Sequence, residues 1–423
     1  MVELKEIKVS EVIFRKDLYP RAEADTKLIA QYAEVIDLLP PIEVNQDYIL
    51  IDGFHRLSAH KQEKKATIKI FITKTKSEEE LFLMSIEKNA AHGMQMSAKD
   101  KKIAALRLFT ADEEHNKRVF KSLAVSERTW REWTSKKQEE LKDQRDERIL
   151  DLYLKAENTQ EMVADQLGIP RETARDVINK AKEELEENGE NGISAESAKN
   201  FSPFIYKIWN VNGKEAGESK YFGKFLDVFM DNLLYYETEP FEVVYDPFGG
   251  SGTTIDSCKK FMRRYYVNDL VLDEVKTQKG IYQHDITTGL PDALPKPDFV
   301  FLDPPYWSQA KDQYSDHKSE LGKKTLKDYY AIFESMAKQL GKRMTKGGKV
   351  AFVIQPTEYN NDFIFEDHAY ELMKIFEKAG FKVKNRRILP YSTEQYNAQM
   401  VNKAKETHND LVLHRDLVVM VKE

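Results

Sequence analysis

Residues 243–254 read VVYDPFGGSGTT, and residues 301–307 read FLDPPYW. Each stretch is a short run of β-branched, aromatic or other apolar residues that ends abruptly in a turn rich in glycine or proline. Such runs are typical of buried parallel strands that deliver a loop to the carboxyl edge of a sheet. Ligands of open α/β sheets bind at that edge. The two loops therefore predict one pocket with two functions, a cofactor cradle and a reaction site.

The bulk composition is typical of a soluble protein with hydrophobic cores. A length of 423 residues allows about two to four domains at roughly 100–200 residues each. Hydrophobic residues make up 41% of the chain and charged residues 32%. No apolar run reaches the roughly 20 residues that span a bilayer, and the N-terminus lacks the layout of a signal peptide. The single cysteine, Cys258, excludes an internal disulfide and a cysteine-rich zinc site. We therefore expect a cytoplasmic protein with no membrane partner and no metal.

The net charge is -6 and the isoelectric point is near 6.0. This balance does not favour nucleic-acid binding by itself, because phosphate neutralisation depends on where Lys and Arg side chains lie. A DNA-binding interpretation therefore requires local basic faces.

The pattern of strands and helices divides the chain into four segments. Residues 1–95 mix short strands and helices, 96–188 are helical, 189–200 form a linker, and 201–423 alternate strands and helices. The alternation predicts a mostly parallel sheet, so the fold class is α/β. The predicted strands of the last segment are 242–245, 264–268, 298–302, 349–354, 381–389 and 411–421, and 221–236 is predicted to be an amphipathic helix.

A glycine follows the short predicted strand 49–51, and the next helix carries an arginine. Exposed amides at a helix start and a guanidinium fork together suit an anion. The same spacing also fits an ordinary strand, turn and helix with a surface arginine. The residues concerned are Gly53, His55 and Arg56.

Residues 158–178 predict a helix-turn-helix, with a sharp turn at Gly168. The start of its second helix is where a recognition helix contacts base edges. The same pattern fits a helical hairpin that packs two domains together, and residues 119–130 hold a similar pattern. The candidate DNA-binding residues at the start of the second helix are Arg171, Thr173 and Arg175.

The glycine loop lacks the Gly-Lys-Ser/Thr ending of a P-loop and the full spacing of a dinucleotide loop. Close backbone approach without a lysine suits a ligand that has no phosphate charge. Asp269 ends the next predicted strand, where a carboxylate can bind two ribose hydroxyls. Asp285 lies beside the third strand, where it could accept from an adenine amine. Each acid taken alone also fits a solvated or capping residue.

The DPPY loop predicts an amine clamp. Its prolines lack N–H donors and restrict the backbone, which leaves an edge rich in acceptors. The Asp303 carboxylate and the Pro304 carbonyl could accept both hydrogens of an exocyclic amine, and Tyr306 could stack on its base. Positioning and electrostatics would then raise the reactivity of a poor nucleophile. Inside a duplex the base must first be flipped out.

The segment 200–423 resembles the amino-group DNA methyltransferases that use S-adenosylmethionine. The resemblance rests on the glycine loop, the DPPY loop and the closing segment 408–419. It implies a Rossmann-like sheet, S-adenosylmethionine as the cofactor, and double-stranded DNA as the partner of a nucleoid-associated bacterial or phage protein. The implied cofactor-binding residues are Asp246, Phe248, Gly250, Gly252, Thr253, Asp269 and Asp285. The implied catalytic residues are Asp303, Pro304, Pro305 and Tyr306.

Residues 5–90 resemble the N-terminal domain of the ParB/sulfiredoxin-like superfamily, an α+β domain. The matching pieces are PPIEV at 40–44, LIDGFHRLSA at 50–59 and EKN at 87–89. In that family the Gly-x-x-Arg segment contacts nucleotide phosphates, which makes a nucleoside triphosphate a second cofactor candidate, at Gly53, His55 and Arg56. Partition proteins usually carry Glu-Arg where this chain has Phe54 and His55, so nucleotide hydrolysis is not implied.

The order of the two loops departs from that of many relatives, which place the glycine loop after the DPPY loop. Too little chain lies between the loops for a separate target-recognition domain. The insertions that could touch DNA are 307–325, which begins with Trp307, and 360–368. We therefore predict that the helix-turn-helix region selects the site, and that deleting residues 1–190 abolishes site preference.

Adenine N6 is the leading target, and cytosine N4 is the alternative, since both require an amine clamp. A serine at position 303 would favour cytosine, and an asparagine there would favour a glutamine methylase of proteins. Ribosomal RNA methylation also uses such a loop, but the ParB-like and helix-turn-helix segments favour DNA. A non-enzymatic alternative is a ParB-like DNA-binding clamp whose methylase domain is catalytically inactive. A homodimer is a further expectation, and a cognate nuclease of a restriction-modification pair is left open.

Overall fold

The computed structural model describes residues 3–20, 25–91, 96–187, 201–210, 227–307, 317–359, 364–390, 398–408 and 410–423. The chain forms two compact units, Met1–Arg145 and Asp146–Glu423. The division lies inside helix α6 (Glu127–Tyr153), whereas the sequence placed the domain limits at 95 and 188. The region predicted as one helical segment is thus shared, because its first helices pack within the first unit and its last pair within the second.

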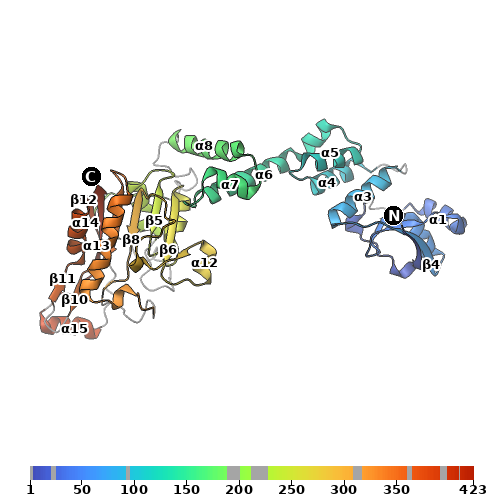
Figure 1. Ribbon diagram of the computed structural model, residues 1–423. Coiled ribbons are helices and arrows are strands. Elements are labelled where there is room, and N and C mark those ends of the chain that lie inside the picture. The colour runs from blue at the N-terminus through green and yellow to red at the C-terminus, as the bar shows by residue number, and fades with distance from the viewer. Residues whose placement is uncertain are drawn as a thin grey trace. The chain divides into compact units, whose positions relative to one another are not determined.

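The first unit is built on a mixed four-stranded sheet with the order β1-β4-β2-β3 (Figure 1). β4 is antiparallel to β1 and parallel to β2, and β2 is antiparallel to β3. Alternate residues of β4, Ile68 and Ile70, are buried, because successive side chains of a strand point to opposite faces of the sheet. The strands are β1 (Glu3–Lys8), β2 (Ile42–Val44), β3 (Leu50–Asp52) and β4 (Thr67–Ile72), and the helices with them are α1 (Thr26–Glu34), α2 (Phe54–Gln62) and α3 (Glu78–Ala91).

A helical cluster completes the first unit. Helices α4 (Ala98–Leu108) and α5 (Glu113–Ser122) pack with α3 and the start of α6 around buried Ala105, Val119 and Trp130. The similar helix-turn-helix pattern at 119–130 corresponds to the turn between α5 and α6. Ala124 in that turn has a φ of +48°. Past this cluster, α6 is mainly exposed until Ile149.

The predicted helix-turn-helix at 158–178 is confirmed as local structure. Helices α7 (Gln160–Leu167) and α8 (Arg171–Glu187) flank Gly168, which ends α7 with a φ of +64°. Thr159 caps α7 by accepting a hydrogen bond from the amide of Met162 at 3.3 Å. The two helices pack with the end of α6 around a small core that contains Ile149, Val163, Ala174 and Ile178.

The second unit contains a seven-stranded sheet with the order β12-β13-β9-β8-β5-β6-β7 (Figure 1). The five strands from β9 to β7 are parallel, and β13 lies antiparallel between β9 and β12. This sheet confirms the α/β fold class and the mainly parallel strands. The bounds are β5 (Val243–Asp246), β6 (Arg264–Asp269), β7 (Tyr282–Gln283), β8 (Phe299–Leu302), β9 (Lys349–Ile354), β12 (Phe381–Pro390) and β13 (His414–Lys422).

Helices cover both faces of this sheet, so its strands are apolar on both sides. In β5, Val243 and Tyr245 belong to the core under α13 (Leu326–Arg343) and α14 (His368–Lys378), whereas Val244 belongs to the opposite core under α10 (Asp227–Glu237) and α11 (Thr253–Lys260). The predicted helix 221–236 is observed from Asp227, and its first residues lie outside the described ranges.

The helix-turn-helix is attached to strand β6 of the large sheet. Lys155 forms a parallel bridge with Tyr265 on β6, with backbone hydrogen bonds of 2.9 Å and 2.8 Å. The Arg264 guanidinium donates to the carbonyls of Tyr153, Ala156 and Asn158. The helix-turn-helix therefore belongs to the same compact unit as the sheet.

The remaining elements are short. The sequence did not predict strand β7 or the hairpin of β10 and β11, because two or three residues carry too little periodicity. These elements are α12 (Glu274–Lys279), β10 (Thr357–Tyr359), β11 (Ile364–Glu366), α15 (Ala398–Thr407) and 3-10 helices at Val9–Glu11, Lys16–Leu18, Ile36–Leu38, Ile286–Thr288 and Leu321–Lys323. No helix within the described ranges has the length and apolar character that a membrane span requires.

Candidate active site

The candidate site lies where the strand order of the large sheet reverses. From β5 the chain adds β6 and β7 on one side, and later β8 and β9 on the other, so β5 and β8 are neighbours. Open α/β sheets bind ligands outside the carboxyl ends of their strands at such a switch point. The glycine loop leaves β5 and the DPPY loop leaves β8. The two loops thus meet at one edge, as their sequences predicted.

The glycine loop runs against the neighbouring strand. The amide of Gly249 donates to the carbonyl of Asn268 at 2.9 Å, and a β-carbon on Gly249 would lie 2.4 Å from Val267 Cγ1. Gly250 and Gly252 have φ values of +49° and +81°, a region that favours glycine. Helix α11 begins directly after Gly252, where the first amides of a helix lack intrahelical partners. The loop therefore offers backbone, rather than bulky side chains, to a ligand.

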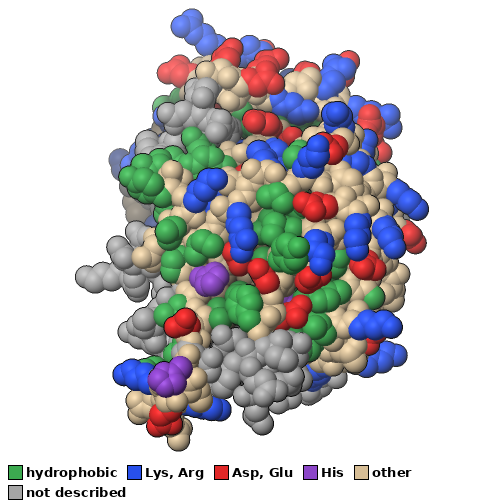
Figure 2. Space-filling model, turned by 90° about the vertical axis from the view of Figure 1, so that its left-hand side faces the viewer, with side chains coloured by type: hydrophobic (Ala, Val, Ile, Leu, Met, Phe, Trp, Pro, Cys, Tyr) green, Lys and Arg blue, Asp and Glu red, His purple; other side chains and the backbone are tan. Residues whose placement is uncertain are grey.

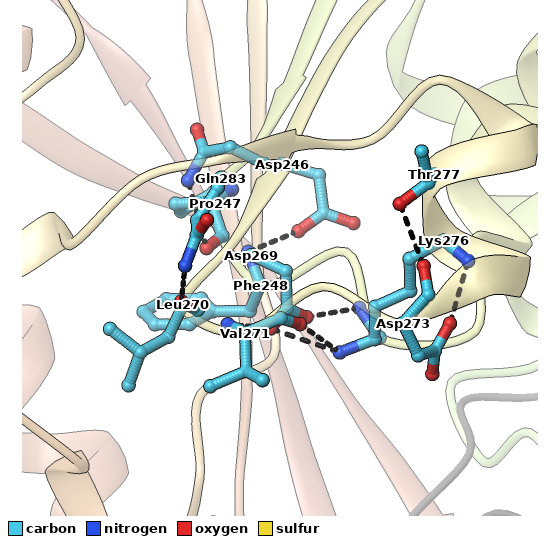
Figure 3. Close-up of polar contacts among 12 residues, drawn as sticks. Asp246, Pro247, Phe248, Asp269, Leu270, Val271, Asp273, Lys276, Thr277 and Gln283 are labelled. Carbon is cyan, nitrogen blue, oxygen red and sulfur yellow. Dashed lines mark hydrogen bonds and ion pairs between the residues drawn. The ribbon is translucent and has the colours of Figure 1, made fainter. Parts of the chain in front are cut away.

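Asp246 anchors this loop from the end of β5 (Figure 3). One carboxylate oxygen accepts from the amide of Phe248 at 2.8 Å, and the other accepts from Thr254 Oγ1 at 2.5 Å. Burial raises the pKa of Asp246 to about 7, although the hydrogen bonds from Thr254 and Phe248 act to lower it. A cationic ligand nearby would favour the ionised carboxylate.

Asp269 ends β6 and faces the glycine loop (Figure 3). Its Oδ2 accepts from the amide of Gly250 at 2.8 Å, and its Oδ1 lies 3.3 Å from the amide of Val271. The ammonium of Lys276, on α12, lies 3.1 Å from the same Oδ1. The carboxylate predicted to bind ribose hydroxyls therefore lies in the expected place and is already paired with a lysine.

Asp285 follows β7 and caps the 3-10 helix that begins at Ile286. Its Oδ1 accepts from the amide and the hydroxyl of Thr287 at 3.0 Å and 2.6 Å. Burial acts to raise the pKa of Asp285, but hydrogen bonds from Ser319 and Thr287 outweigh it, and the pKa is lowered. The capping interpretation of this residue is therefore confirmed, and its carboxylate also lines the pocket.

Asp303 follows β8 and is linked to Tyr306 within the DPPY loop. The Tyr306 hydroxyl donates to Asp303 Oδ1 at 3.1 Å. Burial raises the pKa of Asp303 to about 6, while the positive charge of Arg415 and the hydrogen bond from Tyr306 act to lower it. At neutral pH the carboxylate is therefore mainly ionised, so both of its oxygens are acceptors.

These loops enclose one pocket with a volume of about 380 Å³. Ten of the eleven predicted cofactor-binding and catalytic residues line it, and the eleventh, Gly252, lies at the start of α11. Among the described residues, the carboxylates in the lining are Asp246, Asp269, Asp273, Asp285, Asp303 and Glu320. Lys276 is the lysine among the lining residues. An acidic pocket repels phosphate and suits a ligand that carries positive charge, such as a sulfonium.

The end of the DPPY loop packs inward. Tyr306 is buried in the core beneath the pocket, and Trp307 is half-buried against it. The indole N–H of Trp307 donates to the carbonyl of Lys324 at 3.0 Å, and its ring lies 6.0 Å from that of His368. Trp307 was predicted to touch DNA, but its polar atom is used inside the protein.

The helix-turn-helix candidates lie on the first turns of α8. Arg171 and Arg175 are exposed and Thr173 is half-buried, whereas Ala174 between them packs into the small core. The two guanidinium groups can therefore reach a partner. Figure 2 views the side that lies at the left of Figure 1, and there Lys and Arg side chains are interspersed with Asp and Glu.

The N-terminal candidates form a tight internal structure. Gly53 has a φ of +105° and begins α2. Arg56 donates to the carbonyl of Pro40 at 3.0 Å and to Asp52 Oδ2 at 2.7 Å, and also to the carbonyl of Pro41. His55 is buried and accepts from the amide of Asp25 at 3.1 Å. Because the Arg56 guanidinium is held by internal acceptors, the geometry gives a nucleoside triphosphate at this position no support.

Three contributors to the site were not predicted from the sequence. Thr254 and Thr253 are adjacent in the glycine loop, and the sequence does not tell which of them contacts Asp246. In the structure the Thr254 hydroxyl donates to the Asp246 carboxylate. Lys276 carries no local signal of its contact with Asp269. Arg415 lies in the closing segment 408–419, but the sequence assigned it no role, and only the fold brings its charge close enough to act on Asp303.

Comparison with solved structures gives partial, low-identity likenesses. TrmN from Thermus thermophilus is 17% identical, with a TM-score of 0.30, and the match covers 48% of this chain and 50% of TrmN. A precorrin-6y C5,15-methyltransferase from Geobacter metallireducens GS-15 is 12% identical, with a TM-score of 0.30, and the match covers 50% of this chain and 95% of that protein. A Pnob8-like ParB-N domain is 14% identical, with a TM-score of 0.24, over 31% of this chain and 67% of that chain.

No curated protein matches the chain. The family described as DNA methylase, N6_N4_Mtase, matches residues 40–277, which is more than half of the 423 residues. The matched range contains the glycine loop and Asp269, and it ends before Asp303. With both loops at one switch point and a family match of this extent, the chain belongs to the N6_N4_Mtase family of DNA methylases.

Proposed function

We propose that this protein transfers a methyl group from S-adenosylmethionine to the exocyclic amine of a flipped base in double-stranded DNA, with adenine N6 as the acceptor. The observation that carries the proposal is the single pocket in which the glycine loop and the DPPY loop meet. Cytosine N4 is the alternative acceptor, because the same clamp would hold its amine.

The pocket has features that fit the cofactor. Gly249 lets the glycine loop lie directly against β6, since a β-carbon there would lie 2.4 Å from Val267 Cγ1. Asp246, Asp269 and Asp285 line the pocket. Asp269 would accept from the ribose hydroxyls, Asp285 would accept from the adenine amine, and Asp246 would attract the cationic part of the ligand. When bound, S-adenosylmethionine supplies an electrophilic methyl group on a sulfonium.

The DPPY loop would hold the acceptor base. Asp303 accepts a hydrogen bond from the amine and thereby raises electron density on its nitrogen, since a carboxylate with a pKa of about 6 is mainly ionised at neutral pH. The carbonyl of Pro304 provides the second acceptor. Transfer would form an N–C bond and break the S–CH3 bond of the sulfonium, which would leave as a neutral thioether. The ionised Asp303 carboxylate would accept the proton that the amine loses.

Target selection is assigned to the helix-turn-helix of α7 and α8. Its attachment to β6 by backbone hydrogen bonds and by Arg264 would fix its distance from the pocket. Arg171, Thr173 and Arg175 are then the residues that contact DNA. The first unit is proposed to be a ParB-like module that adds to DNA affinity.

The purified protein would be incubated with methyl-labelled S-adenosylmethionine and plasmid DNA, and the modified nucleoside would be identified after digestion. Labelled N6-methyladenine supports the proposal, and labelled N4-methylcytosine supports the alternative. Absence of label under conditions where the cofactor binds would favour a DNA-binding clamp without methyl transfer.

A further inference from the structure

Lys276 is a cationic side chain in an acidic pocket. Among the described residues, it is the lysine in a pocket lining that includes six carboxylates. The side chains of Lys276 and Asp269 are 16% and 17% exposed, so this pair is shielded well beyond an ordinary surface ion pair. The ammonium also donates to the carbonyl of Val271 at 2.9 Å (Figure 3). The lysine thus reaches from α12 into the part of the pocket assigned to ribose.

The number of hydrogen bonds that Asp269 can accept decides whether it can bind Lys276 and a ribose diol at the same time. Each carboxylate oxygen can accept about two hydrogen bonds. Oδ1 receives Lys276 and the amide of Val271, and Oδ2 receives the amide of Gly250. A ribose diol that donates to both oxygens needs one acceptor position on each. Oδ1 can provide its position only if the ammonium moves.

We propose that Lys276 occupies the position of one ribose hydroxyl and must be displaced when the cofactor binds, so that it lowers affinity for every ligand that carries a ribose diol. This inference rests on the proposed function, because it takes the pocket to bind S-adenosylmethionine. The flexible four-carbon stem allows the ammonium to move while the carbonyl of Val271 remains within reach. The carboxylate of Asp269 stays in place through its bonds to the two backbone amides.

The same helix provides a matched control. Lys279, one turn further along α12, pairs with Asp256 at 2.6 Å, and neither of these two residues lines the pocket. Lys279→Met removes the same charge and the same hydrogen-bonding group without changing Asp269. Lys276→Arg keeps a cation that can still pair with Asp269.

The test is titration calorimetry of the full-length protein with S-adenosylmethionine, S-adenosylhomocysteine, adenosine and 2′,3′-dideoxyadenosine. Lys276→Met should bind the first three ligands roughly threefold to tenfold more tightly than wild type, the range expected for release of one partly shielded ion pair. The dideoxy ligand should bind both proteins alike, and Lys279→Met and Lys276→Arg should match wild type.

Other outcomes overturn the inference. Equal or weaker binding of adenosine by Lys276→Met would mean that Lys276 only supports Asp269 or is irrelevant. A gain confined to S-adenosylmethionine, or shared by the dideoxy ligand, would mean a general charge effect. If wild type binds neither S-adenosylmethionine nor S-adenosylhomocysteine, the proposed cofactor itself is wrong, which distinguishes that failure from the failure of the lysine's role.

Discussion

The Tyr306 hydroxyl donates a hydrogen bond to Asp303 Oδ1 at 3.1 Å, inside a loop of four residues that leaves the central part of the sheet. The sequence suggested Tyr306 as a stacking partner for a base. The structure adds a second role for the same side chain, because this hydrogen bond stabilises the ionised form of a buried carboxylate.

The first prediction concerns the acid limb of the pH–rate profile. Asp303 must be ionised to take up the proton that the amine loses, so kcat/KM should fall as the pH drops below about 6. Tyr306→Phe removes a hydrogen bond to a charged group, worth about 1.5–3 kcal/mol. The pKa of Asp303 should therefore rise, and the acid limb should move up by about one pH unit or more. A limb at the wild-type position in Tyr306→Phe would contradict this role.

The second prediction separates transfer from binding. Asp303→Ala should lower kcat by about 10²–10³, the usual loss when one group that stabilises developing charge is removed. Its Kd for S-adenosylmethionine should change little, because Asp303 is assigned to the base. Asp303→Asn keeps one acceptor oxygen and should retain more activity, without the acid limb. Single-turnover kinetics and calorimetry measure the two effects, and unimpaired transfer by Asp303→Ala would refute the amine clamp.

The third prediction concerns stability against pH. The folded state binds the Asp246 proton more tightly than an unfolded chain does, since the pKa rises from 3.8 to about 7. The stabilisation from this group is therefore complete below pH 3.8 and is lost as the pH rises through about 7. Asp246→Asn lacks this loss. Between pH 5 and pH 8.5, the unfolding free energy of wild type should therefore fall by about 2–3 kcal/mol more than that of Asp246→Asn.

Urea unfolding at the two pH values measures this shift. Asp303 contributes a decline in the same direction to both proteins, so the difference between them reports Asp246 together with its charge coupling to Asp303. Asp256→Asn, on the exposed side of α11, serves as the control. A difference that is constant with pH would exclude a raised pKa at Asp246.

The fourth prediction concerns which truncated chain folds. The structure favours a chain that starts at Asp146 over the deletion of residues 1–190. Leu154 and Ala156 bond to Tyr265, and Tyr153 packs against Phe241 at a ring distance of 5.9 Å, so a chain starting at 191 should lose stability. A chain starting at Asp146 keeps the second compact unit and should fold and transfer methyl groups. Thermal unfolding and plasmid methylation compare the two deletions.

Site preference is then tested in the longer of these two chains. Replacing Arg171 and Arg175 by alanine should weaken discrimination between sites by about 1–3 kcal/mol for each base that an arginine no longer recognises, while activity on a non-preferred site stays similar. Sequencing of methylated positions provides the readout. Unchanged selectivity in the double variant would assign site choice to another part of the chain.

The local sequence determined most of the architecture around the site. The apolar runs that end in Asp246, Asp269 and Asp303 predicted strands whose bounds agree with β5, β6 and β8 to within one residue at each end. Their loops met at one edge because parallel strands place all their carboxyl ends together. The helix-turn-helix was also encoded locally, by the cap at Thr159 and the glycine at 168.

Only the tertiary structure decided which side chains meet. Lys276 reaches Asp269, Arg415 influences Asp303, and Arg264 holds the helix-turn-helix. The contacts of Arg415 and Arg264 join elements far apart in the chain, so they depend on sheet order and packing. Lys276 follows Asp269 by seven residues, and its contact depends on how α12 packs after β6. The same reason explains the unit boundary inside α6: a continuous helix carries no signal of which core each of its ends will join.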